Sequence, residues 1–151
     1  MGIIVEPGDP RDPAARDLLG QSHSLMRSLF SPEDNHFLDV ERLAQDDILF
    51  FVAREFGATL GTGALALRDG YGEVKSMFTA PFVRGRGVAG MILDRLELEA
   101  RARGLPLLRL ETGTGLDAAH RLYARMGFRP RGPFGDYEPS AYSVFLEKPL
   151  V

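Results

Sequence analysis

The sequence contains no cysteine, and this absence removes several kinds of chemistry at once. Without thiols the chain has no disulfide framework, no thiolate metal site and no cysteine nucleophile. The Gly-x-Ser-x-Gly motif of serine nucleophiles is missing too, so serine catalysis lacks support. Any group transfer by this chain must therefore take a route other than a cysteine nucleophile.

Long apolar runs are absent as well. No segment approaches the ~18 apolar residues of a membrane span, and the first six residues lack the basic and apolar regions of a signal peptide. A chain of 151 residues with 44% hydrophobic and 26% charged content is typical of one globular domain. We therefore expect a single soluble domain over residues 1–151, located in the cytoplasm.

An excess of positive charge is also missing. The formal net charge of −3 argues against a nucleic-acid partner, and no membrane partner is expected. His23, His36 and His120 are too scattered along the chain for a metal site, and no His-Glu-x-x-His occurs. We therefore expect no metal and a small-molecule ligand.

The most informative stretch that is present runs from Glu73 to Ala100. Residues 73–79 alternate polar and apolar side chains, and Pro81 cannot continue a hydrogen-bonded ladder, which predicts a strand ending near residue 79. From Val88 the apolar residues recur close to helical spacing, and Gly104 ends the pattern. A strand is thus predicted to lead through a short loop into an amphipathic helix.

That loop predicts an anion site. Gly85 and Gly87 let backbone N–H groups converge on one point, and the unpaired N–H groups of the first helical turn add partial positive charge. The spacing fits neither a Walker loop, which ends in Gly-Lys-Ser/Thr, nor the Gly-x-Gly-x-x-Gly dinucleotide fingerprint. The motif present in this loop is Arg84-x-x-Gly87-x-Ala89.

This motif resembles the Arg/Gln-x-x-Gly-x-Gly/Ala signature of the GNAT superfamily of acyl-CoA N-acyltransferases, whose loop wraps the pyrophosphate of coenzyme A. Within that superfamily, the strand EVKSMFT is similar to the ELKRMYV strand of a group of small bacterial acetyltransferases. The resemblance is dense from residue 73 onward and thin before it. Further similar segments are LLRLET at 107–112, Leu122-Tyr123 with Gly127-Phe128, GPFGDY at 132–137 and SVFLEKPL at 143–150.

The resemblance and the hydrophobic patterns together predict an α+β fold. We expect a mixed, mostly antiparallel central sheet with helices on both faces, in the order β, α, α, β, β, β, α, β, α, β. The elements are expected at residues 2–6, from 13 onward, and at 40–44, 48–53, 60–67, 73–79, from 88 onward, 107–112, 116–126 and 141–147.

The resemblance implies acetyl-CoA as acyl donor and direct attack by a primary amine in a ternary complex. It implies that the strand ending at residue 79 splays from its neighbour at a bulge, so that a backbone N–H there stabilises the oxyanion. The residues implied in holding coenzyme A are Met77, Phe78, Thr79, Arg84, Gly85, Arg86, Gly87, Val88 and Ala89.

Glu73 and Tyr123 are the leading candidates for catalysis, in two different roles. Glu73 could be a solvated strand-end carboxylate or a general base acting directly or through a water, and burial would raise its pKa towards neutrality. Glu111 is the second candidate for that role. Tyr123 by itself is more often a core residue, but the resemblance places the matching tyrosine near the sulfur of coenzyme A. The asparagine often found seven residues earlier is Leu116 here.

The acceptor is expected to lie near the loop at residues 31–39. Asn35 and His36 are the candidate substrate-binding residues there, because polar loop residues often carry function. Two other functions stay open: a catalytically silent CoA-binding or sensor module on the same fold, and a nucleotide-binding protein that uses the loop for ATP. The acceptor amine and the formation of a homodimer also stay open.

Overall fold

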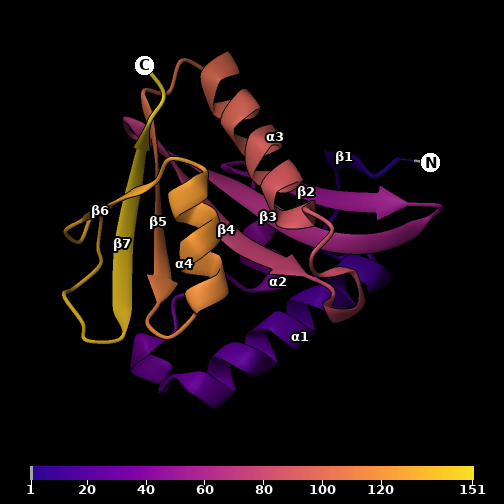
Figure 1. The fold of residues 1–151 in the computed structure, drawn as a ribbon, viewed down its shortest axis with the longest axis horizontal. Helices are drawn as coiled ribbons and strands as arrows, with labels where there is room; N and C mark the ends of the chain where they lie inside the picture. Colours follow the sequence, from indigo (N-terminus) through magenta and orange to yellow (C-terminus); the bar gives the residue numbers. More distant parts are fainter. Residues whose placement is uncertain (1) are drawn as a thin grey trace.

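The computed structural model describes residues 2–151, and its centre is a seven-stranded mixed sheet (Figure 1). The strand order is β1-β2-β3-β4-β5-β7-β6. The strands are β1 (Ile4–Pro7), β2 (Ile48–Glu55), β3 (Ala58–Arg68), β4 (Tyr71–Thr79), β5 (Leu107–Gly113), β6 (Arg129–Arg131) and β7 (Ser143–Pro149). The helices are α1 (Pro13–Leu29), α2 (Val40–Leu43), α3 (Val88–Ala102) and α4 (Asp117–Arg125), with 3₁₀ turns at Pro32–Asp34 and Pro81–Val83.

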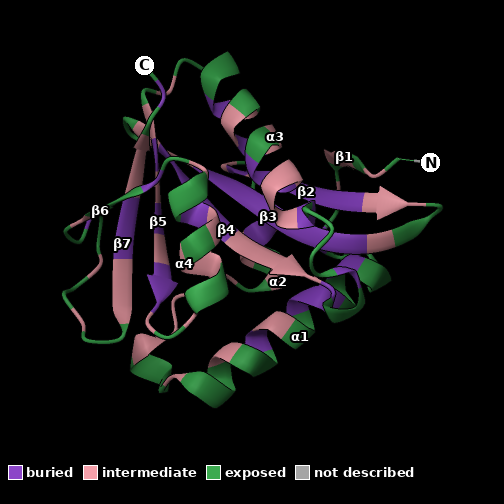
Figure 2. Ribbon diagram, in the orientation of Figure 1, coloured by how far each residue is buried: buried purple, intermediate pink, exposed green. Residues whose placement is uncertain are grey.

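Helices cover both faces of the sheet, as the patterns predicted. Successive side chains of a strand point to opposite faces, and in β2 Phe50 packs in a core cluster with α1 and α2 while Phe51 packs in a second cluster with α3. Figure 2 shows α1, α3 and α4 with their buried sides turned towards the sheet and their exposed sides turned outward. The expected α+β class with a mostly antiparallel sheet is therefore confirmed.

The hydrogen-bonded pairing of strands is interrupted at the centre of the sheet, on both sides of β4. β4 and β5 are the one parallel pair among the described strands, and they pair only at Gly72 with Leu108 and at Glu73 with Arg109. On its other side, β4 shifts register against β3 between Thr62 and Ala64, and Ser76 has a φ of +56°. Such a bulge bends a strand, so β4 diverges from β5 beyond Glu73. The bulge and the divergence that the resemblance implied are both present.

The element order was predicted with one strand missing. β6 was not expected, because Pro130 in a three-residue segment argues against a strand; proline is tolerated here because β6 lies at the sheet edge. The first strand begins at Ile4 rather than Gly2, and the last begins at Ser143 rather than Ala141. Within residues 2–151, no helix combines the length and apolar character that crossing a membrane requires.

Candidate functional site

The glycine-rich loop opens α3 as the sequence predicted. Gly87 is the N-cap residue with a φ of +79°, and Gly85 has a φ of +89°. No side chain among residues 2–151 caps this helix end, so the first-turn N–H groups keep their hydrogen-bonding capacity. A Cβ built on either glycine meets no atom within 4 Å. The space over this backbone is open to a ligand.

The two arginines of the loop are held differently. Arg86 forms a two-pronged ion pair with Glu55, with its Nη2 2.8 Å from Oε2. The guanidinium of Arg84 lies 5.7 Å from the centre of the Phe78 ring. The pairing with Glu55 anchors the loop to the end of β2. Arg84 and Arg86 are both exposed. Their predicted contacts with coenzyme A stay a prediction.

A cavity of about 150 Å³ lies where β4 and β5 diverge. Met77 and Tyr123 both line it, as do Glu111, Asn35 and His36. Beyond Glu73, β4 makes no pairing to β5 in the described chain, so the backbone of residues 77–79 is not closed off by a ladder on that side. The divergence therefore opens a slot between the strands.

Two ionisable groups of this slot have shifted acidity. Burial, and secondly the charge of Glu111, raise the pKa of Tyr123 to about 12. Burial also raises the pKa of Glu111, although its carboxylate accepts a 2.8 Å hydrogen bond from Ser143 Oγ. Ser76 Oγ, at the bulge, is buried and has no hydrogen-bond partner among residues 2–151. A buried polar atom without a partner is costly, and here it lines the slot.

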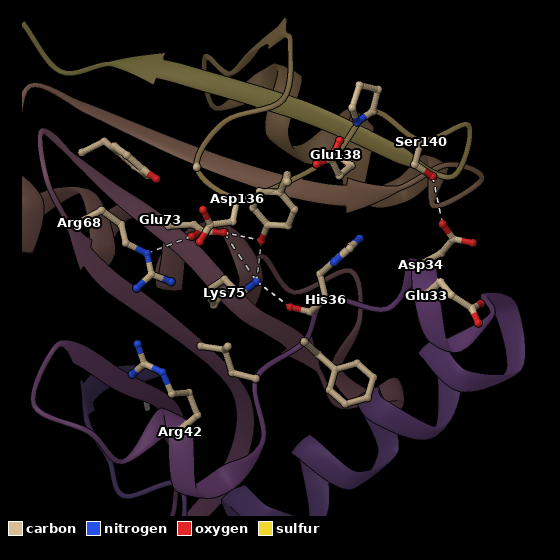
Figure 3. Close-up of a pocket in the computed structure, with 16 residues that line it drawn as sticks. Glu33, Asp34, His36, Arg42, Arg68, Glu73, Lys75, Asp136, Glu138 and Ser140 are labelled. Carbon is tan, nitrogen blue, oxygen red and sulfur yellow. Dashed lines mark hydrogen bonds and ion pairs between the residues drawn. The ribbon is translucent and has the colours of Figure 1, made fainter.

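A larger cavity of about 710 Å³ adjoins the slot and holds Glu73 (Figure 3). Glu73 is 3% exposed. Its Oε2 accepts a 2.6 Å hydrogen bond from Tyr137 Oη and lies 3.6 Å from Lys75 Nζ, and its Oε1 accepts a 3.2 Å bond from Arg68 Nε. Both carboxylate oxygens are therefore engaged.

Lys75 stands on the boundary between the two cavities and lines both. Its Nζ donates to the carbonyl of His36 at 2.8 Å and to Tyr137 Oη at 2.9 Å. Burial lowers the pKa of Lys75, with Glu73 opposing the shift. His36 and Phe37 also line both cavities. The loop between α1 and α2 thus forms part of the wall between them.

The structure brings some predicted site residues together and separates others. Tyr123 and Met77 share the slot with Asn35 and His36, whereas Glu73 lines the larger cavity instead. Asn35 Nδ2 donates to the carbonyls of Phe30 and Ser31, each at 3.2 Å, so its amide ties down the end of α1. The roles of Glu73, Asn35 and His36 stay predictions.

Sequence reasoning missed the three residues that contact Glu73 in the larger cavity: Arg68, Lys75 and Tyr137. A signal existed for Lys75, because residues two apart in a strand face the same side and Glu73 had been singled out. Tyr137 lies in the GPFGDY segment, but nothing in the sequence indicates that it would meet Glu73, 64 positions away.

The chain is similar to known acetyltransferases along most of its length. The model of the acetyltransferase (GNAT) family matches residues 17–128. The chain is 45% identical over 150 residues to the IAA acetyltransferase of Azospirillum brasilense, covering 98% of both chains. It is 40% identical over 151 residues to the uncharacterized N-acetyltransferase YedL of Escherichia coli K12, covering 98% of this chain and 95% of that one.

Solved structures of other proteins share the fold of this chain. A structure from Klebsiella pneumoniae, assigned as an acyl-CoA N-acyltransferase, superposes with a TM-score of 0.86 at 32% identity over 99% of this chain and 98% of the other. The PaiA N-acetyltransferase of Thermoplasma acidophilum, solved with coenzyme A, superposes with a TM-score of 0.76 at 15% identity, covering 99% of each chain. The second likeness concerns the fold alone.

Proposed function

Since this chain belongs to the acetyltransferase (GNAT) family, we propose that it transfers the acetyl group of acetyl-CoA to a primary amine by direct attack in a ternary complex. One observation carries the proposal: the Arg84–Ala89 loop that opens α3 follows the end of β4, the strand whose divergence from β5 opens the slot. The loop offers N–H groups to phosphates, and the slot offers polar groups to a thioester.

The residues present fit coenzyme A. The loop is a cradle that a side chain at Gly85 or Gly87 would fill, because both glycines face open space. Ser76 lines the slot, and its Oγ is buried and unpartnered within residues 2–151, so this hydroxyl is available to a polar group of a ligand. Bound acetyl-CoA supplies the acyl thioester; the Arg84–Ala89 loop and the backbone of Met77, Phe78 and Thr79 are proposed to hold it.

The chemistry left to the chain is proton transfer. The acceptor nitrogen attacks the thioester carbon, the C–N bond forms, and the C–S bond then breaks. We assign removal of the nitrogen's proton to Glu111 and protonation of the sulfur to Tyr123. Glu111 is supported because it lines the same slot as Tyr123 and because burial raises its pKa, which brings a carboxylate closer to the range of an effective base. Glu73 stays the alternative.

Glu111→Gln is expected to lower kcat/KM about 10²-fold near neutral pH, the low end of what a positioned base contributes. The loss should shrink at high pH, where more of the amine is already deprotonated and needs no base. Rates across a pH series with a single amine measure this. Glu73→Gln is the matched comparison, and the pH-dependent loss appearing there instead would return the role of base to Glu73.

The proposed function is tested by thiol release from acetyl-CoA with a panel of primary amines. We expect amine-dependent release, and thermal stabilisation by acetyl-CoA and coenzyme A that exceeds the effect of ATP. Stabilisation by coenzyme A with no thiol release from any amine would favour a silent CoA-binding module. Stabilisation by ATP alone would overturn the assignment of the loop.

A further inference from the structure

The bulge in β4 is held by a side chain of the neighbouring strand. β3 and β4 pair at Thr62 with Phe78 and then at Ala64 with Lys75, so two residues of β4 oppose one of β3. Ser76 is the first of those two residues, and Thr62 Oγ1 donates a 2.8 Å hydrogen bond to its carbonyl oxygen. A bulge leaves a residue out of regular strand pairing. The Thr62 hydroxyl therefore supplies a partner for the carbonyl at the bulge.

Thr62 itself is fixed by close packing. Its side chain is 0% exposed, and the glycines on either side of it let β4 approach β3 closely. A Cβ built on Gly61 would lie 3.0 Å from the carbonyl oxygen of Phe78, and one built on Gly63 would lie 2.8 Å from Sδ of Met77. Interiors packed this tightly leave a side chain little freedom. The hydroxyl that bonds to the bulge is thus held in place from all sides.

Ser76 has a backbone conformation that a residue with a side chain rarely adopts. Its φ of +56° lies in the left-handed region. In the described chain the other such residue that is not glycine is Phe56, in the turn between β2 and β3, where positive φ values are common. Ser76 lies inside a strand instead. Because such a conformation persists only where its surroundings hold it, the bond from Thr62 is a contact that maintains it.

The direction of the next N–H group follows from this bond. The carbonyl of Ser76 and the N–H of Met77 belong to one peptide unit, and no cis peptide bond occurs in residues 2–151. In a planar trans unit these two groups point in opposite directions. Since the carbonyl turns to Thr62 on β3, the N–H points away from β3, and β5 flanks the other side of β4. Beyond Glu73 β5 has diverged, and Met77 lines the slot that results.

We infer that Thr62 is a positioning residue for acetyl transfer. Its hydroxyl fixes the peptide unit between Ser76 and Met77, so the Met77 N–H is aimed at the thioester oxygen before the amine attacks. That oxygen gains negative charge during the attack, and a donor fixed in advance stabilises it without reorganisation. The inference rests on the proposed function, because it assumes that the thioester lies in the slot. Thr62 does not line the slot, so it acts through the peptide unit.

Two substitutions test this role by removing different halves of one side chain. Thr62→Val keeps the volume and loses the hydroxyl, whereas Thr62→Ser keeps the hydroxyl and loses the methyl group. We expect Thr62→Val to lower kcat about 10- to 100-fold, less than the 10²–10³-fold cost of deleting an oxyanion donor, with little change in KM for acetyl-CoA. Thr62→Ser should stay close to the unmodified protein. Thr62→Ala is a second variant without the hydroxyl, in case valine prevents folding.

A role in packing alone predicts the reverse order of the two variants. Loss of a buried methyl group leaves a cavity, so serine would then be the more damaging substitution and valine the milder one. A larger fall in kcat for Thr62→Ser than for Thr62→Val would overturn the inference. Thr59→Val is the matched control, because Thr59 lies in the same strand and outside the slot, and it should keep full activity.

A binding measurement separates this inference from the proposed function. Acetyl-CoA and S-ethyl-CoA differ only at the carbonyl oxygen, and calorimetry without an amine compares them without turnover. We expect acetyl-CoA to bind about 2- to 10-fold more tightly, the range for one neutral hydrogen bond. Thr62→Val should abolish this preference and Thr62→Ser should keep it.

The two proposals fail in different ways. A preference for acetyl-CoA that depends on the Thr62 hydroxyl, without thiol release for any amine, would refute the transferase and leave the aimed N–H standing. Thiol release with the same kcat and the same preference in Thr62→Val and the unmodified protein would overturn the role of Thr62 and leave the transferase standing.

Discussion

Tyr123→Phe is expected to lower kcat by ~10²–10⁴-fold while leaving the affinity for coenzyme A and the thermal stability nearly unchanged. The chain has no cysteine, so direct attack by the amine is the simplest path and the remaining task is to protonate the departing sulfur. A positioned acid contributes about that factor, or roughly 2.7–5.4 kcal/mol of barrier. Steady-state rates over a range of both substrates measure the effect.

The surroundings of Tyr123 support this role. Burial raises its pKa to about 12, so the phenol keeps its proton up to about pH 10, where an unperturbed tyrosine is half ionised. Wild-type kcat should therefore show no alkaline fall from this group below that pH. The ring packs edge-on against Phe128, with centroids 5.7 Å apart. Phenylalanine preserves that packing and removes only the proton donor.

Tyr142→Phe is the matched control, because Tyr142 is 54% exposed and lines neither cavity. It should behave as wild type. Initial-rate plots for the unmodified protein should intersect, since no acetyl-enzyme forms. A fully active Tyr123→Phe would mean that Tyr123 serves core packing and not proton transfer. Parallel lines in the initial-rate plots would contradict direct transfer.

Most of the fold could be predicted because its elements carry local signals. The Arg84–Ala89 loop follows a proline-terminated strand and precedes an apolar stripe, and each of these signals lies within a few residues of the boundary it marks. β6 has no such signal. Its three residues include Pro130 and are held by pairing with β7, a contact between segments that no local pattern encodes.

The candidate site also contains residues that a local motif predicts and residues that only long-range contacts position. Tyr123 and the loop were predicted because a motif marks them, whereas the position of Glu73 depends on neighbours that come from distant segments. Arg68 lies across the turn from β3 to β4, and Tyr137 arrives from the connection before β7. Only the folded chain shows that these groups occupy both oxygens of Glu73. The alternation of β4 predicts its face, but not which side chains meet it there.

Gly87→Val is expected to weaken the binding of coenzyme A by about 10²–10⁴-fold. If the loop wraps a pyrophosphate, a Cβ at Gly87 fills the open space that the phosphate oxygens need. Losing two N–H bonds to a charged group, at about 1.5–3 kcal/mol each, corresponds to that range in Kd. Titration calorimetry with coenzyme A measures the change directly.

Backbone strain is the competing explanation, because Gly87 has a φ of +79° and valine rarely adopts that conformation. Gly104→Val separates the two effects. Gly104 stands at the opposite end of α3 with a φ of +71°, and a Cβ there also meets no atom within 4 Å. Both variants therefore carry similar strain, and both should lose similar thermal stability. Only Gly87→Val should lose affinity for coenzyme A, since only its added side chain stands where the phosphates are proposed to bind. Equal affinity in the two variants would remove the loop from the binding site.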